Sequence, residues 1–352
     1  MPDADMRSAR LTAQLLAGRR ARTPEDVVAR VLAVQAQDPR GFRLAVRARS
    51  TGLGVDDVER ALTERRSLVV TWLQRGTLHL VTADDYWWLH PLLAPRIVTN
   101  NERRLRQEGV SARQADHGVE VITRTLDMGE ARTRDELRAL LDDAGVPTAG
   151  QALVHVVVAA SLRSDIVRGP MAGNHHAFVS ARRWLGAPPP AVSRDEALAV
   201  LARRYLAGHG PATADDLAKW TGLPLRDARA GFEAIAGEVM RRDDGLVTLK
   251  GARTRARAPA AQLLGPFDPL LHGWASREPF VGPYRNVVTS NGIFRPVVLV
   301  DGRVVATWGL AGGQVTVKTL EPIPSHALDA LRRDAADVLR FLALPPSAPV
   351  VS

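Results

Sequence analysis

Residues 213–224 read Thr213-Ala214-Asp215-Asp216-Leu217-Ala218-Lys219-Trp220-Thr221-Gly222-Leu223-Pro224, and they predict the fold most clearly. Thr213 is a good N-cap, and the paired aspartates place negative charge at the positive end of the helix that follows. The turn at 222–224 leads into a second helix, predicted over 225–236, in the position of a recognition helix. A hairpin follows, with strands predicted over Val239–Arg242 and Leu246–Lys250 around Asp244-Gly245. This order is typical of a helix-turn-helix with a wing.

The same order of elements is predicted twice earlier in the chain. The first unit has helices over Leu11–Leu16, Thr23–Gln37 and Val55–Glu64, then strands over Leu68–Leu73 and Thr77–Val81. The second has helices over Val119–Leu126, from Thr133 and over Gln151–Leu162, then strands over Asp165–Val167 and Ala177–Val179. Beyond residue 259 the pattern changes to a hairpin around Asp301-Gly302, one further strand and a final helix over Ser325–Leu342.

The expected fold class is therefore α+β. Three tandem winged-helix units are predicted to form a concave basic surface, with a C-terminal α/β remainder packed on them. The predicted bounds are 1–112 for unit 1, 113–190 for unit 2, 191–258 for unit 3 and 259–352 for the remainder.

Composition points to a polyanionic partner. The 352 residues carry a formal net charge of +9, and the basic residues are nearly all arginine, which favours bidentate recognition of phosphate. A general bias toward Ala, Arg, Gly and Pro contributes to this excess and weakens the argument without removing it. The hydrophobic and charged fractions, 45% and 24%, are those of a globular protein.

The absence of cysteine excludes disulfides, thiol catalysis, iron–sulfur clusters and thiolate zinc sites. A reducing cytoplasm is the expected location. No apolar run reaches the length of a membrane span, and no secretory signal is evident. We expect no membrane association, no cofactor, no metal and no obligate protein partner.

Two glutamines stand out in Val34-Gln35-Ala36-Gln37-Asp38-Pro39. The helix predicted from Thr23 continues its apolar stripe through Val31 to Gln35, which turns that amide toward the interior. Because Asp38 precedes a proline, the helix is expected to stop near Ala36 or Gln37, so that both amides can converge on one point. The alternative interpretation is a helix C-terminus whose glutamines bind otherwise unpaired carbonyls.

Other polar residues are candidates for contacts with nucleic acid. Arg75, Thr77 and His79 would share one face of a strand if alternation holds through Gly76, although the same pattern fits a solvated face. Four arginines surround the third wing and could contact phosphate, or could form an ordinary solvated charge run: Arg241, Arg242, Arg253 and Arg255. His175 and His176 lack a third ligand at a recognisable spacing, so no metal site is predicted.

Five segments resemble, in this order, the AlkZ-type winged-helix DNA glycosylases. They are Gln35-Ala36-Gln37, Trp72 to Val81, Asp215 to Pro224, Phe267-Asp268-Pro269-Leu270-Leu271, and Asn291-Gly292 with Val300-Asp301-Gly302. The resemblance covers nearly the whole chain. It implies excision of alkylated purines from double-stranded DNA, with Gln35 and Gln37 at the positions of the family's Gln-x-Gln catalytic motif.

The resemblance also favours one substrate class. Members with glutamine at both positions are similar to self-resistance enzymes that remove bulky adducts of DNA-alkylating natural products, and some unhook interstrand crosslinks. The expected protein is thus a monofunctional, monomeric glycosylase for N7-alkylated purines. Two alternatives stay open: a winged-helix transcription regulator without catalysis, and a glycosylase that acts only on small methyl lesions.

Overall fold

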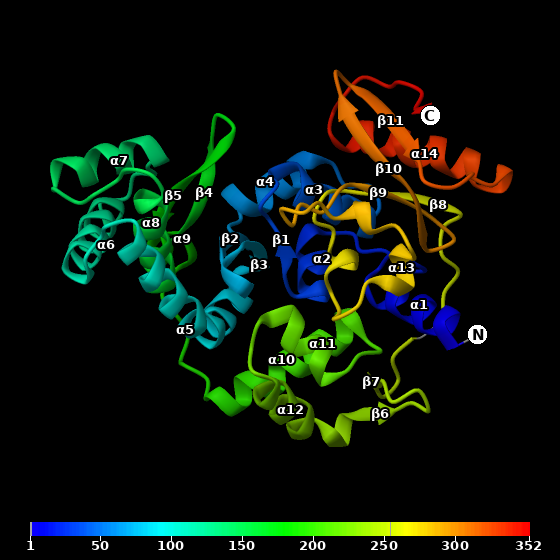
Figure 1. The fold of residues 1–352 in the computed structure, drawn as a ribbon, viewed down its shortest axis with the longest axis horizontal. Helices are drawn as coiled ribbons and strands as arrows, with labels where there is room; N and C mark the ends of the chain where they lie inside the picture. Colours follow the sequence, from blue (N-terminus) through cyan, green and yellow to red (C-terminus); the bar gives the residue numbers. More distant parts are fainter. Residues whose placement is uncertain (1, 254) are drawn as a thin grey trace. The chain divides into compact units, whose positions relative to one another are not determined.

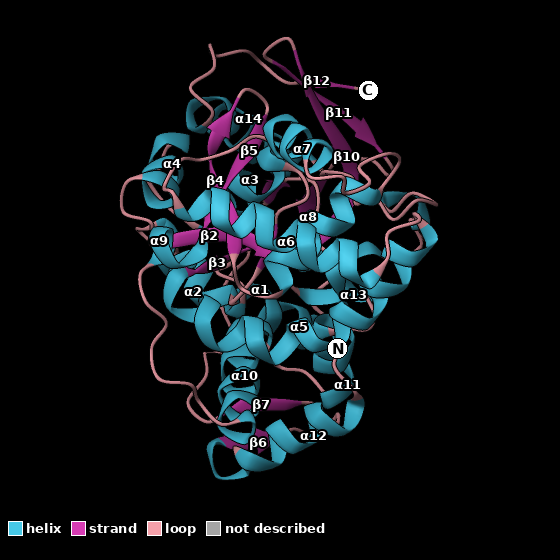
Figure 2. Ribbon diagram, turned by 90° about the vertical axis from the view of Figure 1, so that its left-hand side faces the viewer, coloured by secondary structure: helices cyan, strands magenta, loops and turns pink. Residues whose placement is uncertain are grey.

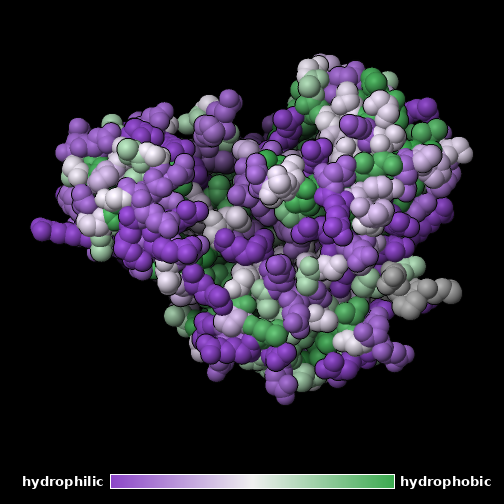
Figure 3. All heavy atoms as spheres, viewed as in Figure 1, coloured by the Kyte–Doolittle hydropathy of each residue, from purple (hydrophilic) through white to green (hydrophobic). Residues whose placement is uncertain are grey.

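The computed structural model describes residues 2–253 and 255–352. The chain folds as two compact units, one formed by residues 1–59 and 198–352 and the other by residues 60–197. The mixture of helices and antiparallel strands confirms the predicted α+β class (Figure 1). Polar side chains cover most of the face drawn in Figure 3, as expected for a globular protein with buried cores.

The unit formed by residues 60–197 combines a sheet with a helical layer. Its strands lie in the order β3-β2-β4-β5 and are antiparallel. Ile166 and Phe178 of the sheet share one hydrophobic core with Val119 and Val156 of the helices that cover it, α6 and α8 (Figure 2). The elements are β2 Leu68–Trp72, β3 Leu78–Thr82, α5 Ala83–Gln107, α6 Ala112–Asp127, α7 Arg134–Asp143, α8 Ala152–Leu162, β4 Ile166–Ala172, β5 His175–Ser180 and α9 Ala181–Leu185.

The other unit begins with short helices and contains the predicted helix-turn-helix. Thr213 caps α11 in a capping box with Asp216, and Gly222 ends that helix in the left-handed conformation. These elements are α1 Pro2–Ala13, α2 Pro24–Val31, β1 Val34–Gln35, α3 Pro39–Arg49, α11 Ala214–Thr221, α12 Leu225–Ala234, β6 Val239–Arg241 and β7 Val247–Leu249. Helices α4 Val55–Thr63 and α10 Arg194–His209 each begin in one unit and end in the other. The order of α10 to β7 confirms the helix-turn-helix and hairpin predicted there.

A second sheet, with the strand order β12-β11-β10-β9-β8, completes this unit. Helix α14 packs on β8. As predicted, Asp301 and Gly302 form the turn between β9 and β10, with φ of 47° and 80°. The elements are β8 Ala261–Leu264, α13 Glu278–Val281, β9 Val297–Val300, β10 Arg303–Ala311, β11 Gln314–Thr319, α14 Ser325–Phe341 and β12 Val350–Val351.

The prediction was wrong about the helix before the glutamines. Helix α2 ends at Val31 because Leu32 adopts φ 66° and ψ −42°, outside the helical region, and residues 34–35 are extended. The Asp38-Pro39 pair, interpreted as a helix stop, is a helix start. Asp38 caps α3 by accepting from Gly41 N at 2.7 Å, and Pro39 occupies the first helical position.

Candidate active site

The two glutamines lie in the short segment between α2 and α3, with Gln35 at the end of β1 and Gln37 in the bend that follows it. The side chain of Gln35 is 5% exposed, whereas Gln37 is exposed to solvent. The convergence expected from a helix end therefore arises where the short strand β1 is followed by a bend.

The side chains of the two glutamines contact each other directly. Gln35 Nε2 donates a hydrogen bond to Gln37 Oε1. In this arrangement the carbonyl oxygen of Gln35 and the amino group of Gln37 keep hydrogen-bonding capacity for a ligand. The pair presents neutral, polar atoms at the boundary between the buried and the exposed parts of the segment.

Helix α3 fixes the C-terminal end of this segment. Its first turn packs so closely on the backbone at Pro266 that a Cβ atom on Gly41 would lie 2.5 Å from the carbonyl oxygen of Pro266. Gly265 faces the same helix, where its Cβ would lie 2.8 Å from Leu44 Cβ. Both glycines therefore permit a close approach between the start of α3 and residues 265–266 that a larger side chain would prevent.

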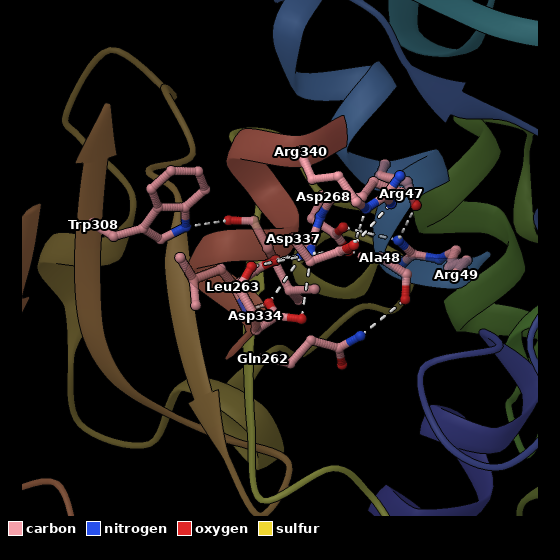
Figure 4. Close-up of polar contacts among 12 residues, drawn as sticks. Arg47, Ala48, Arg49, Gln262, Leu263, Asp268, Trp308, Asp334, Asp337 and Arg340 are labelled. Atoms are coloured by element: carbon pink, nitrogen blue, oxygen red, sulfur yellow. Dashed lines mark hydrogen bonds and ion pairs between the residues drawn. The ribbon is translucent and has the colours of Figure 1, made fainter. Parts of the chain in front are cut away.

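Arginines of α3 anchor the rest of the helix through buried ion pairs (Figure 4). Arg49 and Asp268 are both fully buried, with Arg49 Nη2 2.7 Å and Nη1 2.8 Å from the two carboxylate oxygens. Arg49 Nη2 also donates to Gln14 Oε1 at 2.8 Å. Asp268 in turn accepts from Leu270 N at 2.9 Å, so both partners of the pair make further hydrogen bonds.

Arg47 forms a second anchor. Its guanidinium lies 3.0 Å from Asp334 and 2.9 Å from Asp337, both on α14, and it donates to the Leu263 carbonyl of β8 at 2.6 Å. Burial alone would lower the pKa of Arg47, but the two carboxylates raise it above its ordinary value. A third arginine, Arg43, donates to the Pro39 carbonyl at 2.6 Å and contacts Glu59.

The candidate residues Arg75, Thr77 and His79 belong to the unit formed by residues 60–197. Arg75 does not lie on the strand as predicted, because it occupies a 3-10 turn at 74–76 with φ 54°. Thr77 Oγ1 donates to the Gln74 carbonyl at 3.1 Å. His79 is 1% exposed, with Nδ1 3.0 Å from the Thr77 carbonyl oxygen. Of the three, the Arg75 side chain is the exposed one.

The four arginines near the third wing differ in their surroundings. Arg242 is committed to Asp244 at 2.9 Å within the hairpin, and Arg255 lies 3.3 Å from Asp5. Arg241 and Arg253 are exposed.

Within residues 2–253 and 255–352, no cluster of His, Cys, Asp or Glu is arranged to hold a metal ion. In the same residues no helix has both the length and the apolar character that a membrane span requires.

The residues that sequence reasoning missed are Asp38, Gly41 and the arginines of α3. The signal for Asp38 was present, since an Asp-Pro pair is also a common helix start. The role of Gly41 depends on a contact with residue 266, which no local pattern reveals.

The fold and the paired amides define an α+β protein with a helix-turn-helix and hairpin and a neutral polar site, a combination suited to nucleic acid. The sequence profile of a family described as DNA glycosylase AlkZ-like matches residues 28–341. The chain is 30% identical over 354 residues to an interstrand DNA cross-link repair glycosylase of Streptomyces sahachiroi, with 94% of each chain covered. The solved structure of Streptomyces sahachiroi DNA glycosylase AlkZ superposes with a TM-score of 0.81 at 28% identity, covering 99% of this chain and 98% of the other.

The chain therefore belongs to the AlkZ-like DNA glycosylase family. It is an enzyme that acts on DNA, and the resemblance carried by five sequence segments is confirmed over nearly the full chain.

Proposed function

We propose that Gln35 and Gln37 form the catalytic centre of a monofunctional glycosylase that hydrolyses the N-glycosidic bond of N7-alkylated purines. One observation carries this proposal: the two amides meet on a segment whose downstream end is fixed by α3. We propose bulky adducts or crosslinks as the lesions, and the name of the Streptomyces sahachiroi relative, an interstrand DNA cross-link repair glycosylase, supports the crosslinks. The cytoplasm, where genomic DNA is found, is the proposed location.

The chemistry of the lesion explains why neutral amides suffice. A purine alkylated at N7 carries a positive charge, so it leaves readily without protonation by the enzyme. The transition state then has the character of an oxocarbenium ion at the sugar, and the remaining task is to place a water at C1′. The free carbonyl oxygen of Gln35 can accept a hydrogen bond from that water, and Gln37 holds the Gln35 amide in position. An undamaged base would require stronger acid–base catalysis.

DNA contacts are proposed for a set of residues outside the glutamine pair. Arginines supply phosphate contacts, and the turn before β3 and β3 itself supply further polar groups. The set consists of Arg75, Thr77, His79, Arg241, Arg242, Arg253 and Arg255. We also propose that residues 1–112, 113–190 and 191–258 are three tandem winged-helix units and that the strands and helix of residues 259–352 pack on them.

The direct test is base excision from duplexes that carry one N7-alkylguanine, prepared with a small, a bulky and a crosslinked adduct and scored as alkali-labile abasic sites. Gln35→Ala and Gln37→Ala should each lower the single-turnover rate by about 10²-fold or more. The dissociation constant for the same DNA should change little. Gln107→Ala, which removes an exposed glutamine of α5, is the matched control. Wild-type rates in both active-site variants would refute the assignment.

The same assay separates the alternatives. A non-catalytic regulator would leave all three duplexes intact and would protect one specific sequence in a footprint. An enzyme for small lesions alone would form abasic sites only in the methylated duplex. The helix-turn-helix of α11 and α12 is the observation that favours the regulator.

A further inference from the structure

An unusual concentration of arginine lies in the turn between α1 and α2. Arg19, Arg20 and Arg22 line a groove with a volume of about 760 Å³. The opposite wall is the chain that follows β7, and it includes Lys250, Arg253 and Arg255. Figure 1 shows this chain passing beside α1, and Ser8 Oγ ties the two together by donating to the Ala256 carbonyl at 3.2 Å.

A second hollow, of about 420 Å³, adjoins the first at Arg20. It is formed by the end of α3, the start of β8 and one side of α14. Its charged lining comprises Arg20, Arg47, Arg333, Arg340, Asp334 and Asp337. We name the two hollows together the arginine groove.

The charge of the arginine groove accounts for most of the excess positive charge of the protein. Among the described lining residues there are ten basic side chains and three carboxylates, a formal excess of seven positive charges. The whole chain has a formal net charge of +9. Like charges gathered in one concave place destabilise a fold unless a polyanion neutralises them.

Several basic side chains of the arginine groove are not neutralised by ion pairs within the described chain. Arg19, Arg22 and Arg253 are exposed, and no carboxylate of the described chain lies within 4 Å of any of them. Arg30 donates a hydrogen bond to the Ala13 carbonyl at 2.9 Å, and Lys250 donates one to the Gly237 carbonyl at 2.7 Å. The pKa of Arg20 is lowered, chiefly by burial.

Two of the three carboxylates of the groove are already engaged. Asp334 and Asp337 bind Arg47, and Asp337 also binds Arg340 at 2.7 Å. Asp26 is thus the remaining acid in the described lining. The unpaired positive charge of the described lining therefore lies at Arg19 and Arg22 of the turn and at Arg253 of the opposite wall, where a guanidinium can bind a phosphate in bidentate fashion.

We propose that the arginine groove binds the sugar–phosphate backbone of duplex DNA away from the lesion, which rests on the proposed function of the chain as a DNA glycosylase. Phosphate is the shared chemistry of a DNA strand and an anionic lipid surface. A membrane site would combine basic residues with exposed large apolar side chains. Such side chains do occur on the described surface, for example Met128, Met240 and Ile293, but none lines either hollow.

The test is the salt dependence of binding to an undamaged duplex of about 20 base pairs. Arg19→Ala, Arg22→Ala and Arg253→Ala combined should lower the slope of log K against log salt by up to about 3, since each phosphate contact contributes roughly 0.9. Between about 50 and 200 mM salt the wild type should then lose roughly 40-fold more affinity than the triple variant. For the Arg19→Ala, Arg22→Ala double variant, the single-turnover excision rate at saturating DNA should stay within about twofold of the wild type, because the groove lies outside the glutamine pair.

Controls make the result specific. Arg332→Ala also removes one positive charge, but that side chain is committed to Asp329 at 2.8 Å and lies outside both hollows, so its slope should equal that of the wild type. Replacing the three arginines by lysine should restore most of the slope. If the triple variant does not fold, each single alanine change should lower the slope by roughly 0.9.

An unchanged slope in folded variants would overturn the proposal. So would a loss of binding to vesicles of anionic phospholipid without a change in DNA binding. Since undamaged DNA is the ligand, a protein that excises no base but shows the expected slopes would disprove the catalytic assignment and leave the groove assignment standing.

Discussion

The buried Arg49–Asp268 pair allows a quantitative prediction about the support of α3. Replacing Asp268 by alanine leaves the Arg49 guanidinium, which has no exposed surface, without its counter-charge. Removing one partner of such a pair costs about 3–5 kcal/mol. The total free energy of unfolding of a protein is about 5–15 kcal/mol, so Asp268→Ala should remove a large part of the stability of this unit.

The measurement is urea denaturation followed by circular dichroism, with the free energy of unfolding extrapolated to water. Asp329→Ala is the control, because the exposed pair with Arg332 should contribute less than about 1 kcal/mol. A double variant, Arg49→Met with Asp268→Leu, should recover most of the loss, since it buries no unpaired charge. A cost below about 1 kcal/mol for Asp268→Ala would show that this pair does not anchor α3.

Two other close contacts lead to measurable effects. Gly41→Ala should lower the single-turnover excision rate about tenfold or more with little effect on DNA affinity, because the new Cβ displaces the start of α3 from Pro266. Gly54→Ala is the control: its new Cβ would lie 4.0 Å from the nearest neighbour, so the excision rate should stay unchanged. His209 is buried, mainly by packing against Tyr205 and Trp220, and burial lowers its pKa to about 3. The pKa of His209 in the folded state is below its unfolded value, so its contribution to stability is complete above about pH 6.5 and falls as the pH drops toward about 3. At about pH 5 the free energy of unfolding should be about 2 kcal/mol lower than at about pH 7.5. His209→Phe should abolish this difference when denaturation is compared at the two pH values.

Local signals explain why the helix-turn-helix was predictable. The Thr213 cap, the Gly222 end and the Asp244-Gly245 turn each depend on a few neighbouring residues, and all three appear in the structure as expected. Such signals are decided by backbone geometry and capping, which act within one turn of chain.

The prediction failed where tertiary contacts decide the outcome. Helix α3 was not predicted, because its buried arginines disguise the apolar face and their partners, such as Asp268 and Asp334, are more than 200 residues away. Helix α5 was not predicted either, since Pro91 and Pro95 interrupt its pattern. The glutamines were predicted to converge, and they do, but the predicted cause, a helix end at residue 36 or 37, was wrong. The helix ends earlier because Leu32 leaves the helical region, and leucine is not a residue that signals a helix end.

The short segment that carries the glutamines also explains the spacing of the motif. On a helix, two side chains that act together are separated by three or four positions. Here the strand ends at Gln35 and the chain bends at Gln37, so the two amides meet across the single buried residue Ala36. One residue inserted between the glutamines would move one amide away from the other, so the length of this short stretch matters as much as its composition.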